Sequence, residues 1–178
     1  MSEHRKLKLT ELNRLSTEEF HRVEKNPLVV VLDNIRSHHN VGSIFRTADA
    51  FRIEKIILCG FTPVPPHREI HKTALGATDT VKWEYMEKTM DAVVQLKLAG
   101  YKVYAVEQAE NSTMLDHFPE IKGEKTAVVF GHEVNGVGQE VMDSCDGVIE
   151  VPQQGTKHSL NISVCAGIVM WELFCKLR

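Results

Sequence analysis

The sequence has no excess of positive charge, few cysteines and no long apolar run. Its 178 residues carry a formal net charge of −3, so no overall basic field predicts nucleic-acid binding. Any RNA contact must come from a local patch or from surface pooled across an oligomer. The four cysteines, Cys59, Cys145, Cys165 and Cys175, lie far apart without a CxxC pair. This spacing predicts reduced thiols, with neither a disulfide framework nor a metal site.

Membrane insertion and secretion are also not predicted. The longest apolar run, Val164–Trp171, is too short to cross a bilayer. The N-terminus lacks the pattern of a secretory signal peptide. We therefore expect a cytoplasmic protein, with a chain long enough for one domain with a substantial core.

The first 26 residues differ from the rest of the chain. Residues 1–26 are polar and of mixed charge, and Ser16-Thr17-Glu18-Glu19 resembles a capping box ahead of a short helix. We expect residues 1–26 to form a short helical extension and residues 27–178 to form the main domain.

Strand and helix patterns alternate through residues 27–178, which predicts an α/β fold with a mainly parallel sheet flanked by helices. The predicted strands are 28–32, 56–58, 81–84, 101–106, 126–130 and 148–151, and the main helices are 41–51, 89–99 and a last helix that starts at Ser159. Ligands of such sheets bind beyond the carboxyl ends of the strands. Three polar loops that contain glycine, 34–42, 131–138 and 153–161, are expected to meet there.

The last helix is apolar on nearly every face, so it must be buried against its own domain or a partner. Its expected first turn, however, carries Ser159, Asn161 and Ser163. These polar groups either cap the helix or contact a ligand, because helix N-termini suit polar and anionic ligands.

The predicted helix 41–51 has Asn40 as its expected cap and carries Arg46 beside an apolar stripe. Gly42 and Arg46 share a helix face, so the missing side chain at Gly42 leaves room for Arg46 or a ligand. The alternative is a structural ion pair between Arg46 and Asp49, one turn further on. His132, in the second loop, is more typical of a solvated loop histidine than of a catalyst.

Three motifs in this chain resemble those of a known family. They are NxGxxxRxA from Asn40 to Ala48, FGxExxG from Phe130 to Gly136, and PxxGxxxSLNxS from Pro152 to Ser163. In this order they resemble the motifs of the SpoU/TrmH family, which are RNA ribose 2′-O-methyltransferases of the SPOUT superfamily. The resemblance covers roughly residues 27–175.

The resemblance implies a C-terminal deep trefoil knot, S-adenosyl-L-methionine as the cofactor, and a homodimer with Arg46's helix and the last helix at its interface. It implies that tRNA or rRNA is the partner. Residues at positions that match the methyl-donor site are Val106, Gly131, Val151, Gln153, Ser159 and Leu160. Positions that match the family's polar catalytic site are Asn40, Arg46, Glu133, Ser159 and Asn161.

The role of Arg46 has two interpretations under this resemblance. It could accept the proton of the ribose hydroxyl, as is proposed for the family. A guanidinium normally stays protonated, however, so Arg46 could instead hold a phosphate and stabilise the developing alkoxide. We favour the second interpretation on physical grounds.

Two other functions are compatible with parts of the sequence. One is a catalytically silent knotted paralogue that binds RNA. The other is a hydrolase that uses Ser159 with His158 or His132, although GxSxG is absent and neighbouring side chains on a helix would diverge. The candidates for RNA contact are Arg5, Lys6, Lys8, Arg14, His38, His39, Arg68 and Lys72.

Overall fold

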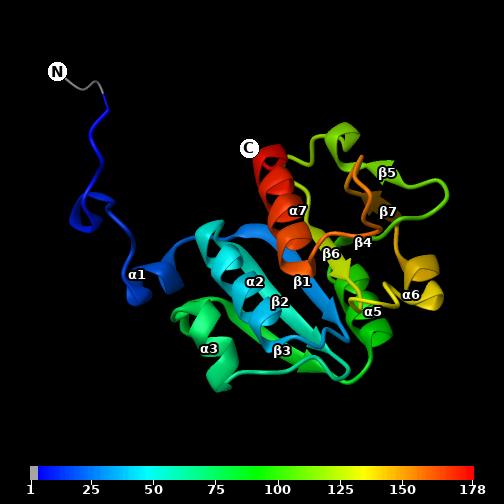
Figure 1. The fold of residues 1–178 in the computed structure, drawn as a ribbon, viewed down its shortest axis with the longest axis horizontal. Coiled ribbons are helices and arrows are strands. Elements are labelled where there is room, and N and C mark those ends of the chain that lie inside the picture. Colours follow the sequence, from blue (N-terminus) through cyan, green and yellow to red (C-terminus); the bar gives the residue numbers. More distant parts are fainter. Residues whose placement is uncertain (1–3) are drawn as a thin grey trace.

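The computed structural model describes residues 4–178 and contains a seven-stranded sheet (Figure 1). The strands are β1 (Asn26–Asp33), β2 (Ile53–Cys59), β3 (Lys82–Met86), β4 (Lys102–Val106), β5 (Thr113–Met114), β6 (Thr126–Phe130) and β7 (Gly147–Glu150). Their order is β3-β2-β1-β6-β4-β7-β5, and every pairing is parallel. The prediction of a mainly parallel α/β sheet is confirmed.

Helices cover both faces of this sheet (Figure 1). They are α1 (Thr17–Arg22), α2 (His38–Ala50), α3 (Arg68–Ala74), α4 (Ala77–Thr80), α5 (Thr89–Leu98), α6 (Gln139–Ser144) and α7 (Ile162–Lys176), with 3-10 turns η1 (Leu9–Glu11) and η2 (Leu115–His117). One apolar cluster joins the sheet to α2, α3 and α7, and a second joins it to α5 and α6. Because both faces are covered, the central strands are continuous apolar runs.

The N-terminal extension contains the predicted capping box. Ser16 Oγ accepts a hydrogen bond from the Glu19 backbone N–H at 3.2 Å, and the Glu19 carboxylate accepts one from the Ser16 N–H at 2.8 Å. These bonds satisfy orphan donors at the start of α1. Phe20 from α1 is buried, and the His21 ring hydrogen-bonds to the Asp79 carbonyl at 2.9 Å, so α1 packs against the rest of the chain.

One predicted helix cap and one predicted helix start are wrong. Helix α2 begins at His38, and its cap is Ser37, whose hydroxyl accepts from the Asn40 N–H at 3.3 Å. Asn40 therefore lies inside the helix, where its side chain is free for other contacts. Helix α7 begins at Ile162 and is capped by Asn161, so Ser159 lies in the preceding loop.

One side of α7 is not covered within the described chain. Val164, Ile168 and Trp171 are 51%, 40% and 52% exposed, whereas Ala166, Val169 and Met170 are fully buried. Helices α2 and α7 lie side by side, and the Phe51 ring at the end of α2 stacks on Phe174 of α7 (Figure 1). Among residues 4–178, no helix is long and apolar enough to cross a membrane.

Candidate active site

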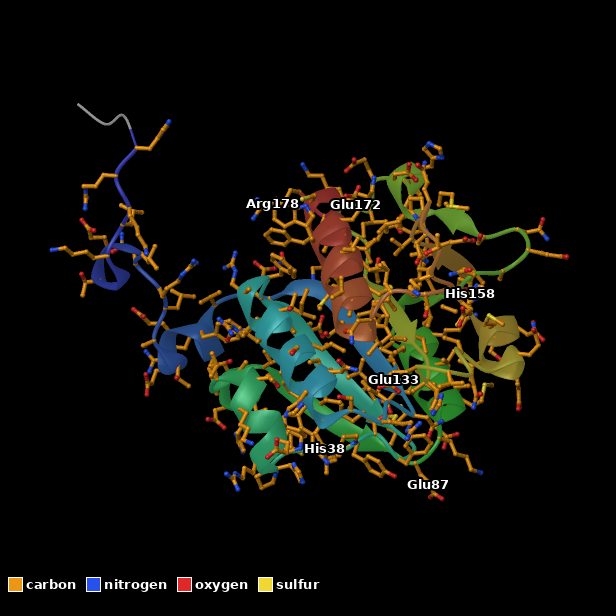
Figure 2. The ribbon with its side chains drawn as sticks, viewed as in Figure 1. His38, Glu87, Glu133, His158, Glu172 and Arg178 are labelled. Carbon is orange, nitrogen blue, oxygen red and sulfur yellow. The ribbon has the colours of Figure 1, made fainter. Side chains whose placement is uncertain are left out.

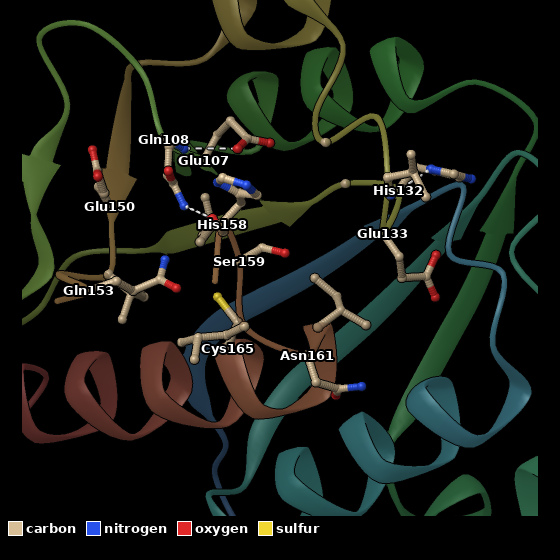
Figure 3. Close-up of a pocket in the computed structure, with 17 residues that line it drawn as sticks. Glu107, Gln108, His132, Glu133, Glu150, Gln153, His158, Ser159, Asn161 and Cys165 are labelled. Carbon is tan, nitrogen blue, oxygen red and sulfur yellow. Dashed lines mark hydrogen bonds between the residues drawn. The ribbon is translucent and has the colours of Figure 1, made fainter. Parts of the chain in front are cut away.

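A pocket of about 500 Å³ opens beyond the carboxyl ends of β4, β6 and β7, beside the start of α7 (Figure 3). This is where ligands bind in parallel α/β sheets. Its lining comes from the ends of these strands, from the turn after β6 and from the loop before α7. The lining residues are Val106, Glu107, Gln108, Gly131, His132, Glu133, Val134, Gly136, Glu150, Val151, Gln153, His158, Ser159, Leu160, Asn161, Ile162 and Cys165.

The turn after β6 closes one wall of the pocket and requires two glycines. The backbones of His132 and Gly136 exchange hydrogen bonds of 3.1 and 2.8 Å. A Cβ at Gly131 would lie 2.2 Å from the carbonyl carbon of Gly136 and from the Val137 nitrogen. Gly136 has φ +66°, and a Cβ there would lie 2.0 Å from a Glu107 carboxylate oxygen. A side chain at Gly131 would therefore clash with backbone atoms of the turn, and one at Gly136 would displace the Glu107 carboxylate and strain a left-handed backbone.

Glu107 and Gln108 directly follow β4, and their hydrogen bonds connect the turn after β6 and the loop before α7 to the end of this strand. The Glu107 carboxylate accepts hydrogen bonds from the Val137 N–H at 3.0 Å and from the Gln108 N–H at 2.9 Å. The Gln108 side-chain amide donates to the His158 carbonyl at 2.6 Å. Sequence reasoning missed both residues, although polar side chains directly after a buried strand were a signal that could have identified them.

Glu133 connects the second loop to the first. Its carboxylate accepts hydrogen bonds from the backbone N–H groups of Arg36 at 3.0 Å and Ser37 at 3.2 Å, and from the Asn40 amide at 3.3 Å. Burial raises the pKa of Glu133, but these backbone and side-chain donors more than offset it and hold the pKa below its usual range. Glu133 is therefore a carboxylate at neutral pH.

Asn40 extends the same network to the third loop. Its side-chain oxygen accepts from the Asn161 amide at 3.3 Å. The Asn161 oxygen in turn accepts from the backbone N–H and the hydroxyl of Ser163, at 2.9 and 2.7 Å. The three loops therefore meet at one place, as predicted.

The residues predicted to contact a methyl donor all line the pocket. They are Val106, Gly131, Val151, Gln153, Ser159 and Leu160. Of the predicted catalytic residues, Glu133, Ser159 and Asn161 line it. Asn40 does not line it but hydrogen-bonds to two lining residues, Glu133 and Asn161. Cys165 also faces the pocket, and its burial raises the thiol pKa to about 11, so the thiol stays protonated.

Arg46 is placed differently from the other predicted catalytic residues. It is exposed on α2 and does not line the pocket. Within residues 4–178 its guanidinium has no ion pair, and Asp49 accepts a hydrogen bond from the Thr80 hydroxyl. The predicted free space at Gly42 is also absent. Helix α3 fills it, since a Cβ at Gly42 would lie 2.1 Å from Thr73 Oγ1.

The arrangement does not support a serine hydrolase. Ser159 and His158 lie in a loop rather than on the helix expected from the sequence. Among the described residues, no histidine ring hydrogen-bonds to the Ser159 hydroxyl. The His132 Nδ1 accepts from the backbone N–H groups of Val134 and Asn135 at 3.0 and 3.1 Å, so that nitrogen is occupied. A nucleophile needs a base within hydrogen-bond reach.

Comparison with known proteins identifies relatives of this chain. The model of the SpoU rRNA Methylase family matches residues 27–171. A protein of Staphylococcus saprophyticus named as a TrmH family tRNA/rRNA methyltransferase is 33% identical over 153 residues, which cover 86% of this chain and 60% of that protein. The chain thus spans about three fifths of the length of this relative.

Solved structures show the same fold. The AdoMet-bound rRNA methyltransferase from Sinorhizobium meliloti matches with a TM-score of 0.80 and 27% identity, over 89% of this chain and 60% of that chain. The A. aeolicus TrmH/SpoU tRNA modifying enzyme has a TM-score of 0.78 at 24% identity, over 90% and 79% of the two chains. With the family model matching most of its length, this chain belongs to the SpoU rRNA Methylase family.

Proposed function

We propose that this protein transfers a methyl group from S-adenosyl-L-methionine to a ribose 2′-hydroxyl of tRNA or rRNA. The observation that carries the proposal is the pocket at the ends of β4, β6 and β7, which is lined by all six residues that match the family's donor site. The S. meliloti relative, which is AdoMet-bound, supports the same donor for this chain.

The pocket fits such a donor in size and chemistry. Its volume of about 500 Å³ lies within the range of small-molecule sites. Its wall includes the carboxylates of Glu107 and Glu150, which suit the positive charges of the donor. When bound, S-adenosylmethionine supplies a methyl group on a positively charged sulfur, which is already a good leaving group.

The chain's own residues then position the reactants. The backbone at Gly131, Val151 and Leu160 would hold the donor, while Ser159 and Asn161 would orient the ribose. The links from Glu133 through Asn40 to Asn161 keep the loops in one arrangement. Alignment of the attacking oxygen and exclusion of water are the main contributions that this displacement requires.

Arg46 would act as a charged group rather than as a base. A guanidinium stays protonated, so it would bind the phosphate beside the target ribose and stabilise negative charge on the 2′ oxygen. Because Arg46 lies outside the pocket of its own chain, we place it at the interface of a homodimer, where two chains complete the site. The exposed strip of Val164, Ile168 and Trp171 on the neighbouring α7 supports this dimer.

We infer a deep trefoil knot in the C-terminal segment. Family membership supports it. After β7, near one edge of the sheet, the chain passes the pocket and returns through α7 to pack beside α2 (Figure 1). We also propose a cytoplasmic location, because cellular tRNA and rRNA would be the substrates.

The test is methyl transfer from labelled S-adenosylmethionine to separated tRNA and rRNA taken from cells that lack the protein. A methylated 2′ oxygen cannot attack the adjacent phosphate, so alkali should release the label as a resistant dinucleotide. Label in ordinary mononucleotides would instead show methylation of a base. No transfer to either RNA, with donor binding confirmed by calorimetry, would favour the silent RNA-binding paralogue.

A further inference from the structure

The loops after β1 and β2 form a surface beside the pocket, which we call the rim. It comprises Arg36 and His38 from the first loop and the start of α2, and Phe61, His67 and Arg68 from the second loop and the start of α3. Figure 2 shows His38 and Glu133 near the same end of α2. The rim borders the site directly, because the Arg36 backbone N–H donates to the pocket residue Glu133 at 3.0 Å.

Hydrogen bonds between the two loops make the rim rigid. The Ile35 N–H donates to the Thr62 hydroxyl at 3.0 Å, and that hydroxyl donates to the Leu32 carbonyl at 3.0 Å. The Phe61 N–H donates to the Asn34 side-chain oxygen at 3.1 Å. A binding surface held in this way loses little conformational entropy when a ligand docks.

Phe61 is a large aromatic side chain left in solvent on this rigid loop. It is 60% exposed, and its ring meets the His132 ring edge-on at a centroid distance of 5.8 Å. His132 lines the pocket, so the Phe61 ring lies next to a pocket residue and is largely exposed to solvent. Unstacked RNA bases bind to such aromatic surfaces in many RNA-binding proteins.

The rim also holds two unpaired cations. Arg36 and Arg68 are exposed, and no described residue forms an ion pair with either guanidinium. The His38 and His67 rings, with centroids 4.0 Å apart, connect the two loops that carry these arginines. Two unpaired guanidiniums on one rigid surface are suited to phosphate contacts.

The neighbouring basic side chains are less available for RNA contacts. His39 and Lys72 both contact the Glu69 carboxylate, at 2.9 and 2.7 Å. That pairing neutralises part of the charge predicted to attract RNA. The free positive charge of this surface therefore belongs to Arg36 and Arg68.

We propose that the rim binds unpaired nucleotides of the RNA substrate next to the target ribose. One flanking base stacks on Phe61, and neighbouring phosphates contact Arg36 and Arg68. The inference rests on the proposed function, since it names how that site would hold RNA. A base inside a duplex has no free face for Phe61, so the rim selects single-stranded or loop segments.

The test measures binding of a fluorescein-labelled, mixed-sequence RNA oligonucleotide to the full chain by anisotropy, as a single strand and as a duplex with its complement. Phe61→Ala should weaken single-strand binding about 5- to 150-fold, the range for loss of one stacked base. Phe61→Trp should bind like the parent. The matched control is Trp83→Ala, because Trp83 is a 37% exposed aromatic near the amino end of β3, away from the pocket.

The salt dependence of RNA binding distinguishes the contribution of the arginines from that of the Phe61 ring. Arg36→Ala and Arg68→Ala should each reduce the slope of log affinity against log salt by about 0.7, the value for one phosphate contact to a single strand. Phe61→Ala should leave that slope unchanged. Unchanged slopes in both arginine variants would refute the phosphate contacts, and equal binding by Phe61→Ala and the parent would refute the stacking.

Methyl transfer, measured separately, distinguishes this inference from the reaction itself. Single-strand binding that depends on Phe61, without transfer to any RNA, would refute the proposed reaction and keep the rim. Transfer that is indifferent to Phe61 and to base pairing of the target would refute the rim alone. Thermal unfolding of each variant shows whether it is folded, and Phe61→Trp serves as the folded reference if the alanine variant is unstable.

Discussion

The pocket and the exposed sides of α2 and α7 differ in how far one chain completes them. In the pocket, Glu107, Glu133 and Asn161 all have hydrogen-bond partners within the chain. On the two helices, Arg46 has no ion pair among the described residues, and Trp171 is 52% exposed. Polar groups that hydrogen-bond to one another hold the walls of a pocket in one arrangement, and exposed apolar strips mark interaction sites. One chain therefore completes the pocket, whereas the exposed sides of α2 and α7 can contact a further molecule.

The largest effect is expected from a substitution in the wall of the pocket, which one chain completes. Gly131→Ala places a Cβ 2.2 Å from the backbone of Gly136 and Val137, which cannot yield as a flexible side chain would. We expect about 1–3 kcal/mol of lost stability, as for other overpacked sites, and donor binding below detection. Gly155→Ala is the control, because its Cβ meets nothing within 4 Å. Calorimetric titration and thermal unfolding measure both effects, and normal donor binding by Gly131→Ala would show that the turn can adapt.

Arg46→Ala tests the exposed side of α2, which one chain does not complete. We expect transfer to fall about 10²- to 10³-fold, as when a group that stabilises transition-state charge is removed. Donor affinity should stay unchanged, and stability should change by no more than about 0.5 kcal/mol because the side chain is exposed and unpaired. Rate constants and donor titrations separate these effects. A parallel loss of donor affinity would instead assign Arg46 to the donor site.

Ile168→Glu tests whether a second copy covers α7. Ile168 is 40% exposed on the uncovered side of that helix. A buried carboxylate there should shift the protein from dimer to monomer in sedimentation, because an unpaired charge is costly in an apolar interface. Donor binding should persist while transfer falls in proportion to the lost dimer. The control is Leu98→Glu on α5, 85% exposed and away from α7. A monomeric parent would refute the dimer outright.

The sequence predicted the strands and their parallel arrangement better than the contacts of individual side chains. Strands β1 and β6 are buried on both faces, so their apolar runs were unambiguous, and the meeting of the three loops followed from the parallel topology. The cap of α2 was harder to predict, because Ser37 and Asn40 are both good cap residues and lie three positions apart. Asn40 lies inside α2 and bonds to Glu133, a residue 93 positions away, and no local pattern shows such a contact.

The remaining misses concern contacts between elements far apart in the chain. The space at Gly42 is filled by Thr73 of α3, a helix of only seven residues. The Glu107 carboxylate is placed by the N–H of Val137, which belongs to the turn after β6. Propensity and periodicity describe neighbours along the chain, so they predict elements well. They cannot specify which side chain fills the gap between two of them.

The smallest effect is expected at Glu133, which connects the pocket to the start of α2. Its pKa is lower in the folded protein than its usual value, so its contribution to stability is present above the unfolded pKa and is lost as the pH falls through the folded one. Below about pH 4.3, the usual Glu value, the parent should lose stability with a slope from this group of at most about 1.4 kcal/mol per pH unit. Glu133→Gln should lack that component, while Glu140→Gln, at an exposed position of α6, should keep it. Urea unfolding between neutral and acidic pH measures the difference, and parallel curves for the parent and Glu133→Gln would mean that the carboxylate contributes no stability to the junction of the three loops.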